Sequence, residues 1–424
     1  MNKLRATVRY TLIGIIVILL CILTWWYFFL ETKQNAVVET ERGRGLRLET
    51  PQFSSPAGNT YLNLVRSIPS TPLWREAHDT AIAVVDLFTD KKQGSKDAAV
   101  KQATLWHVSE LPVAGMAFGA HDTTLRFIER ATGHVLEAHL ETKTLSRITN
   151  TTVPHVEEAY IVKDRVFIRT EEGGVVTTVT ALVEPALGTT LEQKRKLEDY
   201  ITSVAQHPDD SITYIIEQPG KKPVVVSAKP DGTQPKNVTT LGTNGWDARS
   251  FNKNHILLVE RPADDVSGYA IEVTPSGVSP LLRNLPGLTV QTHASSTSLL
   301  YGTSARGVLS LFSQKNSITS PLKLPLHTLA DKCVFAPNGI TAYCAQPKKL
   351  PEKGFLNAWY RGETHTSDSW WSVDTARGTA ELFFDPELED GVSLDVETPV
   401  MSEGGAYIAF RNAQDWSLWL LSLP

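Results

Sequence analysis

The chain has 424 residues, of which 42% are hydrophobic and 21% charged, and its formal net charge is −5 at pH 7. This composition is typical of a globular protein and excludes a fibrous or largely disordered one. Three cysteines are too few for a scaffold stabilised by many disulfides. Beyond residue 30 the chain carries 38 basic against 46 acidic residues, a net −8. The absence of a concentrated basic patch argues against nucleic acid or an anionic lipid surface as the main partner.

The first 30 residues have the pattern of a membrane anchor. Residues 10–30 contain no charged side chain, and as a helix they would extend about 30 Å, the thickness of a hydrocarbon core. Lys3, Arg5 and Arg9 precede this segment, and the positive-inside rule keeps such a terminus in the cytoplasm. We therefore expect a cytoplasmic segment at 1–9, a transmembrane signal anchor at 10–30, and a single-pass plasma-membrane protein whose remainder lies outside the cytoplasm.

A cleaved signal peptide is the alternative for this segment. Its apolar region would be about 7–15 residues long and would end at small residues. Here the apolar run is longer and ends in bulky aromatic residues, so the anchor is preferred. Residues 31–75 carry scattered charge, Gly and Pro with little periodicity, and we expect a linker or stalk there.

A repeat occupies the rest of the chain, for which we expect one β-propeller domain over residues 76–424. Its unit is a short apolar strand, a tight polar, Gly or Pro turn and a second apolar strand, usually followed by two more strands. Successive copies are offset by 42, 45, 44, 43, 42 and 66 residues, and the first five offsets are typical of propeller blades. We therefore predict an all-β fold, a seven-bladed β-propeller of four-stranded antiparallel blades. A pair of β-sandwiches is the alternative, but it requires no fixed period.

The two ends of the repeat predict how the ring closes. The seventh copy stops at Pro424, directly after its third strand, and the strand-like segment 103–111 precedes the first copy without a blade of its own. We expect 103–111 to complete the last blade, because closure removes exposed strand edges. Residues 80–88 are a rival closing strand or an extra edge strand.

Several of these residues resemble a known family. The turns at 208–210 and 337–339 resemble those of TolB-type, WD40-like propeller repeats. The stretch 327–374 is similar to uncharacterised membrane-anchored propeller proteins of the cell envelope of small-genome bacteria. This resemblance implies a fold and an envelope location but no reaction. The residues that carry it are Lys332, Cys333, Tyr343, Cys344, Pro347, Trp359, Tyr360, Gly362, Ser367, Asp368, Trp371 and Asp374.

Cys333 and Cys344 lie on either side of an Asn-Gly turn, on the first and second strands of the sixth copy. A two-residue turn at 338–339 would place them directly opposite each other, whereas a longer loop would offset them by a residue. Metal binding would need further ligands nearby, and a redox motif would bring the cysteines closer in sequence. Outside the cytoplasm we therefore expect a disulfide between them.

The sixth copy also contains a long connection, residues 346–368, which accounts for part of the 66-residue offset. Long loops on a rigid scaffold often carry function. Phe355, Trp359 and Tyr360 could form an amphipathic contact patch there, and we take them as candidate binding residues together with Arg361 and Asp368. The alternative is that the rings cover the side of an over-long blade.

No motif points to catalysis. The sequence lacks H-E-x-x-H, a glycine-rich phosphate loop and a closely spaced histidine cluster, and 302–307 fails as a nucleophile elbow. Oxygen ligands in the acidic segment 385–395 could hold Ca²⁺, but they lack the spacing of an EF-type loop. We therefore assign no catalytic residue, metal site or cofactor.

Two functions remain open at this stage. The first is a non-enzymatic module that binds a protein or cell-wall partner outside the cytoplasm, with no nucleic-acid role. The second is an envelope hydrolase or lyase that uses carboxylates around the propeller channel, since carboxylates distant in sequence can meet in the fold.

Overall fold

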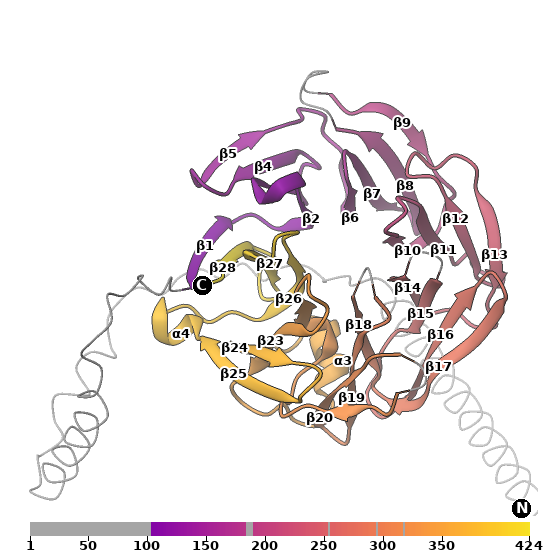
Figure 1. Cartoon of the computed structure of the whole chain (residues 1–424). Coiled ribbons are helices and arrows are strands. Elements are labelled where there is room, and N and C mark those ends of the chain that lie inside the picture. The colour runs from indigo at the N-terminus through magenta and orange to yellow at the C-terminus, as the bar shows by residue number, and fades with distance from the viewer. Residues whose placement is uncertain (1–102, 184–189, 253–254, 294–295, 317–318) are drawn as a thin grey trace, which may run out of the picture. The chain divides into compact units, whose positions relative to one another are not determined.

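Seven sheets surround a central axis in the part of the chain that the structure, a computed structural model, describes (Figure 1). Each sheet has four strands, and every pair of neighbouring strands is antiparallel. The prediction of a seven-bladed β-propeller with four-stranded antiparallel blades is confirmed, and the pair of β-sandwiches is excluded. The described residues are 103–183, 190–252, 255–293, 296–316 and 319–424.

The expected anchor (10–30), the linker (31–75) and the rival closing strand (80–88) lie outside the described residues. Within the described ranges, no helix has the length and apolar character needed to cross a membrane.

We number the sheets as blades 1 to 7 in chain order and give the strands of each from the inside outward. Blades 1 and 2 contain β2 (Val113–Phe118), β3 (Thr124–Glu129), β4 (Val135–His139) and β5 (Thr144–Arg147), then β6 (Val156–Val162), β7 (Arg165–Glu172), β8 (Val175–Leu182) and β9 (Glu192–Lys196). Blades 3 and 4 contain β10 (Ile201–Gln206), β11 (Ile212–Ile216), β12 (Val224–Ala228) and β13 (Lys236–Thr240), then β14 (Trp246–Asn252), β15 (His255–Glu260), β16 (Ser267–Thr274) and β17 (Gly277–Pro286).

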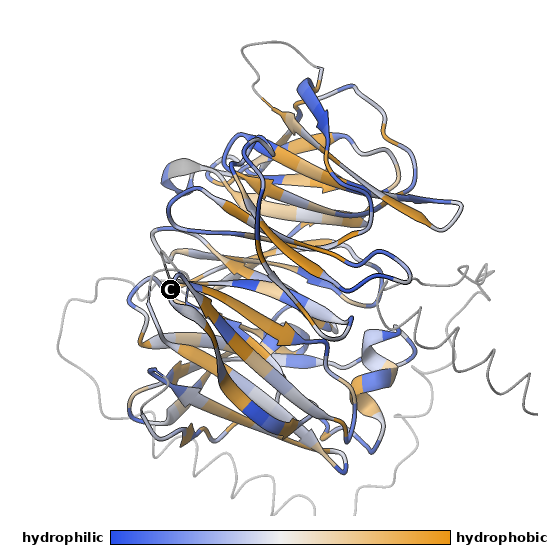
Figure 2. Cartoon of the chain, turned by 90° about the vertical axis from the view of Figure 1, so that its right-hand side faces the viewer, coloured by the Kyte–Doolittle hydropathy of each residue, from blue (hydrophilic) through white to orange (hydrophobic). Residues whose placement is uncertain are grey.

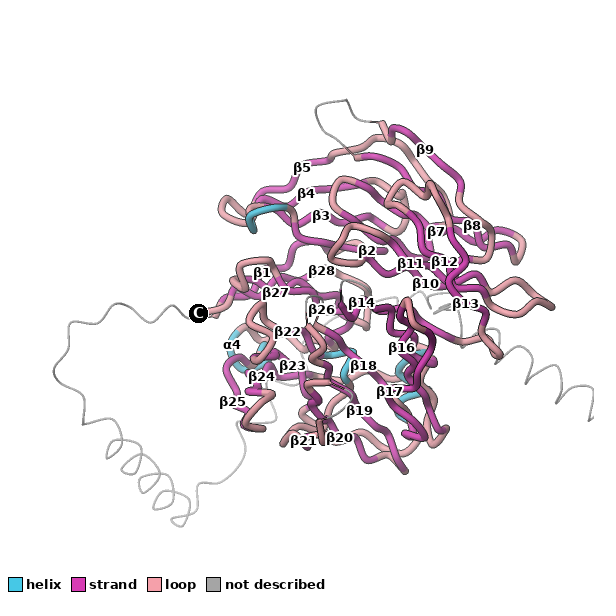
Figure 3. The backbone as a smooth tube through the Cα atoms, turned by 45° about the vertical axis from the view of Figure 1, so that its right-hand side comes forward, coloured by secondary structure: helices cyan, strands magenta, loops and turns pink. Residues whose placement is uncertain are grey.

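The same order holds in the last three blades. Blades 5 and 6 contain β18 (Thr289–Thr292), β19 (Leu299–Ala305), β20 (Val308–Gln314) and β21 (Leu322–Lys323), then β22 (Cys333–Phe335), β23 (Thr341–Pro347), β24 (Asp368–Asp374) and β25 (Thr379–Phe384). Blade 7 contains β26 (Val396–Met401), β27 (Tyr407–Asn412), β28 (Leu418–Ser422) and β1 (Thr104–Ser109). The short helices, cyan in Figure 3, are η2 (Ala120–Asp122), η4 (Ala330–Lys332), α3 (Phe355–Tyr360) and α4 (Pro386–Glu389).

The ring closes through β1, which comes from the segment expected to complete the last blade. It pairs antiparallel with β28, from Thr104 opposite Ser422 to Ser109 opposite Leu418. The outer strand of blade 7 therefore precedes blade 1 in the chain, so blades 1 and 7 are joined by backbone hydrogen bonds rather than by packing alone. This arrangement leaves no open edge between the two ends of the repeat.

The core lies between the blades, because both faces of each sheet pack against a neighbouring sheet. In β20 the alternate residues Leu309, Leu311 and Ser313 are buried, as the two-residue period of a strand requires. Apolar residues follow the strands and hydrophilic ones gather in the turns (Figure 2). The inner strands approach closely at Gly115 of β2, where a Cβ would lie 1.9 Å from the carbonyl oxygen of Ala159 on β6.

The connections divide between the two ends of the ring. In a meander, successive strands run in opposite directions, so the links between second and third strands share one end with the links between blades. We call this end the insert rim, because it carries the long connection 348–367 between β23 and β24. The connections 217–223, 241–245 and 261–266 reach the same end.

Candidate functional site

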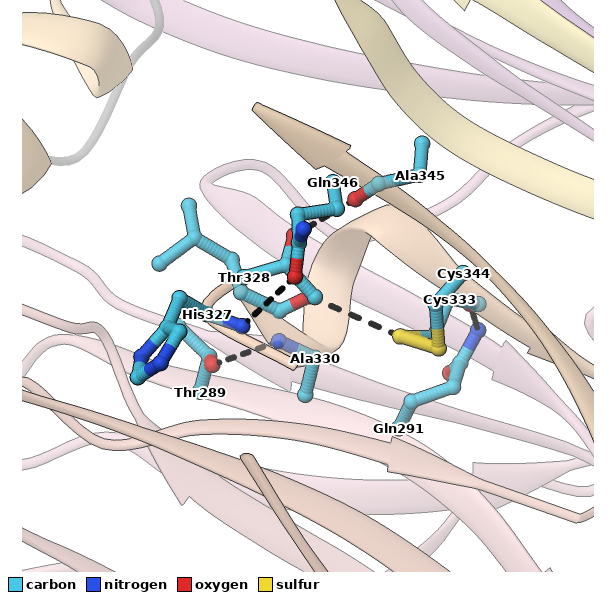
Figure 4. Close-up of a disulfide and its surroundings, with 10 residues drawn as sticks. Thr289, Gln291, His327, Thr328, Ala330, Cys333, Cys344, Ala345 and Gln346 are labelled. Carbon is cyan, nitrogen blue, oxygen red and sulfur yellow. Dashed lines mark hydrogen bonds between the residues drawn. A yellow bond between two sulfur atoms is a disulfide. The ribbon is translucent and has the colours of Figure 1, made fainter. Parts of the chain in front are cut away.

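The two cysteines of blade 6 form a disulfide, which confirms that prediction (Figure 4). Cys333 on β22 lies directly opposite Cys344 on β23, and their Cα atoms are 4.1 Å apart. The turn between the strands has four residues, because the N–H of Ala336 donates to the carbonyl of Thr341. This loop is two residues longer than a two-residue turn at 338–339, one residue on each side, so the cysteines stay opposite each other. The expectation that a longer loop would offset them by a residue is therefore wrong. Both side chains are fully buried, which makes the bond a structural staple.

The long connection of blade 6 forms the helix α3, and its aromatic residues do not make the exposed contact patch considered above. Phe355 and Trp359 are buried against Leu309 of blade 5 and Leu329. Tyr360 is half-buried and donates its hydroxyl to Asp331. These rings are directed inward because the insert folds back over the end of blade 5. Packing there removes the apolar side chains of both segments from water.

Arg361 and Asp368, the other two candidate residues, are separated by the structure. Arg361 forms an ion pair with Glu363, at 2.7 Å from Nη2 to Oε2. Asp368 is 1% exposed and lies in the core of blade 6. Neither side chain extends a binding surface made by the aromatic rings.

A buried ionic group holds this insert in place. We call it the Lys332 cluster, and it consists of Lys332, Thr366, Asp368 and Asp395. The ammonium of Lys332 lies 2.6 Å from Asp368 Oδ2, 2.5 Å from Asp395 Oδ1 and 2.9 Å from Thr366 Oγ1. The indole N–H of Trp359 on α3 donates to both oxygens of Asp395, each at 3.0 Å. A single carboxylate therefore joins blade 6, blade 7 and the insert.

The protonation equilibria in the cluster follow from burial and from the opposing charges. Burial lowers the pKa of Lys332, but Asp368 and Asp395 outweigh it and the pKa is raised. Burial raises the pKa of Asp395, but Lys332, His365 and Trp359 hold it well below its usual range. Burial and the charge of Asp395 raise the pKa of Asp368 despite Lys332. At neutral pH Asp395 is therefore the carboxylate of the cluster whose ionised form is favoured.

The acidic segment considered for Ca²⁺ does not come together around one point. Asp385 caps α4 by accepting from the backbone N–H of Glu387 and Leu388. Its carboxylate and that of Glu387 also pair with Lys348, whereas Asp395 belongs to the Lys332 cluster. In the part of the chain that is described, no group of three or more His, Cys, Asp or Glu side chains could hold a metal ion.

A cavity of about 910 Å³ opens at the insert rim between blades 2, 3 and 4. Its wall is built from the connections that begin or end β7, β10, β11, β14 and β15. Sequence analysis did not find it, because its residues come from three blades and form no local motif. Its charged lining residues are Glu157, Arg169, Glu171, Glu217, Glu260 and Arg261.

The two arginines of the cavity are held by the protein itself. Arg169 donates to the carbonyl of Thr202 at 2.8 Å and pairs with Glu158 at 2.7 Å. Arg261 donates from Nε to Asp247 at 3.2 Å and lies 3.7 Å from Glu217. Both guanidinium groups therefore have anionic partners already.

Glu260 differs from the other charged groups around the cavity. No cationic side chain pairs with it among the described residues, and the backbone N–H of Tyr269 is the only group that lowers its pKa. Burial raises the pKa of its carboxyl group. Thr202 lines the same cavity, but its hydroxyl oxygen is itself buried, and it has no hydrogen-bond partner in the described ranges. The polar group that distinguishes the site is therefore the unneutralised carboxylate of Glu260.

Comparison with known proteins finds similarity in structure only. No protein-family model matches the chain, and no curated protein matches its sequence. An oligogalacturonate lyase in complex with manganese aligns with a TM-score of 0.51 at 12% identity, over 76% of this chain and 91% of that chain. Kuenenia stuttgartiensis hydrazine synthase aligns with a TM-score of 0.51 at 9% identity, over 78% and 99%.

A third solved structure has a similar extent of alignment. The β-propeller domain of Myceliophteria thermophila Cps50 (Swd1) aligns with a TM-score of 0.49 at 10% identity, over 76% of this chain and all of that chain. At such low identities the likeness is one of fold, and the chemistry must be argued from this chain's own residues.

Proposed function

We propose that this protein is a binding module, tethered to the plasma membrane and exposed outside the cytoplasm, whose protein or cell-wall partner contacts the insert rim. The observation that carries the proposal is the cavity, which is a preformed concave site on a rigid scaffold. Rim connections between blades are free to vary without disturbing the sheets, which is why propellers commonly bind partners there.

The proposed location rests on two features of the chain. The uncharged segment 10–30 follows three basic residues, as a signal anchor does. The Cys333–Cys344 disulfide suits an oxidising compartment. Leu388 is 80% exposed, so Leu388→Cys provides a label site on the domain. An impermeant thiol reagent should modify this variant in intact cells, and protection of the cysteine until lysis would overturn the location.

A substitution at the cavity mouth tests the binding face. Asn244 lines the cavity and is exposed, so Asn244→Trp should obstruct it without altering the core. Asn237 lies exposed on β13, the outer strand of blade 3, which leads into the connection that contains Asn244. Asn237→Trp is therefore the matched control. A partner cross-linked in native envelope by the wild type and by the control, but lost from Asn244→Trp, supports the proposal. Equal recovery with all three proteins contradicts it.

An envelope hydrolase or lyase is the second candidate, and the carboxylates of the cavity favour it. Glu217 accepts from the backbone N–H groups of Gly245 and Trp246 at 2.7 and 3.2 Å, whereas Glu260 has a raised pKa. Carboxyl groups in such different environments can divide acid and base roles. Turnover of envelope polysaccharides by the wild type, abolished in Glu260→Gln, would establish this candidate. Equal rates in both proteins would remove it.

A further inference from the structure

The cavity at the insert rim has an excess of negative charge. Its lining contains four glutamates, Glu157, Glu171, Glu217 and Glu260, and two arginines. Both arginines pair with carboxylates outside the lining, Glu158 and Asp247. Glu157 pairs in the same way with Arg130, which also lies outside the lining. An incoming anion would have to break the arginine pairs and approach the unneutralised carboxylate of Glu260, so an anionic ligand is disfavoured.

Glu260 is the group that most needs a partner. A half-buried carboxylate without a cation nearby is poorly solvated, and a charged donor would restore the lost interactions. A ligand with an ammonium or guanidinium group would supply such a charged donor.

The rest of the lining suits an alkyl stem better than a bare cation. Tyr200, Tyr269, Pro219 and Pro262 contribute apolar surface to the wall. Tyrosine rings attract cations through their faces, and apolar walls cover the methylene groups of a long basic side chain. The volume of about 910 Å³ also exceeds what a single side chain requires and lies within the range of sites for larger ligands.

We propose that the cavity binds the basic side chain, lysine or arginine, of a peptide segment of the partner. This deepens the proposed function and rests on it, since it names what the rim recognises. The net charge of −8 beyond residue 30 would also favour the approach of a basic partner at low ionic strength.

Calorimetric titration with a capped trilysine peptide tests the proposal on the purified full chain. We expect binding to the wild type and about tenfold weaker binding to Glu260→Gln, since one charge-assisted hydrogen bond is lost. Binding should also weaken as salt increases. Glu141 is exposed in the turn between β4 and β5, at the opposite end of the ring, so Glu141→Gln is the control that should bind as the wild type does.

Three further titrations test which chemical group binds and whether it binds in the cavity. The same peptide with acetylated lysines keeps its length but loses its charge, and it should not bind. Spermidine carries ammonium groups without a peptide, and binding as tight as that of trilysine would overturn the assignment to a peptide. Asn244→Trp should also weaken trilysine binding. This second cavity variant keeps the proposal testable if Glu260→Gln does not fold. Absence of trilysine binding, or equal affinity in Glu260→Gln and the wild type, would refute the proposal.

The two proposals can fail separately. If Asn244→Trp loses the envelope partner while Glu260→Gln keeps it, the rim binds but does not recognise a basic group. If trilysine binds through Glu260 while Asn244→Trp keeps the partner, the cavity recognises the basic group but the partner contacts another surface.

Discussion

Blade 6 and the cavity-forming blades 2 to 4 use buried charge in opposite ways on the same rim. In blade 6 the ammonium of Lys332 contacts two carboxylates and a hydroxyl, and Lys332 and both carboxylates are closed to solvent. Around the cavity, Glu260 is half-buried and has no cationic partner among the described residues. The ion pairs of Lys332 join neighbouring parts of the fold, although Asp368 Oδ1 has no hydrogen-bond partner among the described residues. The unneutralised Glu260 instead leaves interaction energy for the ligand that we propose.

The two regions meet at a short contact. The carboxylate of Asp264, beside the cavity, accepts from the backbone N–H of Asn357 on α3 at 2.9 Å. The side chain of Asn357 accepts in return from the N–H of Asp264 at 3.1 Å. The insert of blade 6 therefore also fixes the connection 261–266, part of which lines the cavity. Blade 6 therefore supports one wall of the cavity.

The largest effect should come from opening the Lys332 cluster. Lys332→Met leaves two buried carboxylates without a cation, and we expect a loss of about 3–5 kcal/mol in the free energy of unfolding. Lys348→Met is the control, because Lys348 pairs with Asp385 and Glu387 nearer the surface and should cost at most about 1 kcal/mol. Urea unfolding measures both, and equal losses would contradict the contrast between closed and open ionic groups.

Removal of the disulfide should cause the second-largest loss of stability. The double variant Cys333→Ala, Cys344→Ala should lose about 3 kcal/mol of unfolding free energy, since the bond limits the unfolded chain. The wild type unfolded in urea with a reductant should lose a similar amount. Mass spectrometry of the unreduced, denatured and alkylated protein should find these two cysteines linked; both thiols alkylated would contradict the bond.

The two carboxylates of the cluster should differ from each other. We expect Asp395→Asn to cost about 3 kcal/mol at pH 7, because a well-bonded anion is lost, and Asp368→Asn about 1 kcal/mol. The pKa of Asp395 is lowered from 3.8, so its contribution is complete above pH 3.8 and is lost as the pH falls through the folded-state value. The pKa of Asp368 is raised, so its ionisation opposes folding at neutral pH.

Urea unfolding at pH 7 and pH 3 measures this difference. The gap between the two variants should be wide at pH 7 and narrower at pH 3. A greater loss from Asp368→Asn than from Asp395→Asn at pH 7 would show that the two carboxylates have been assigned the wrong way round.

The smallest effect on stability should come from Glu260→Gln in the cavity. The pKa of Glu260 is raised from 4.5, so its ionisation at neutral pH lowers stability. We therefore expect Glu260→Gln to be as stable as the wild type or slightly more stable, within about 0.5 kcal/mol. A clear loss of stability in thermal unfolding would mean that Glu260 is a structural group, and would weaken the case for a ligand.

The sequence by itself determined the repeat, the strand content and the disulfide. These features depend on short-range patterns: alternation along a strand, turn residues at fixed offsets, and two cysteines on either side of one hairpin. The interval before the first copy likewise indicated the strand that pairs with β28. The inward direction of Phe355 and Trp359 was not visible, because their pattern is compatible with either face of an insert.

Only the tertiary structure decided which charged groups meet. Lys332 and Asp395 are 63 residues apart, and sequence analysis considered Asp395 with its acidic neighbours rather than with a lysine of another blade. The cavity likewise takes residues from three blades, and none of them has a local motif. The charge pairs and the cavity depend on distances between segments that are far apart in the sequence, and the order of the residues does not contain these distances. The strands of a blade, in contrast, depend on residues that are close together along the chain.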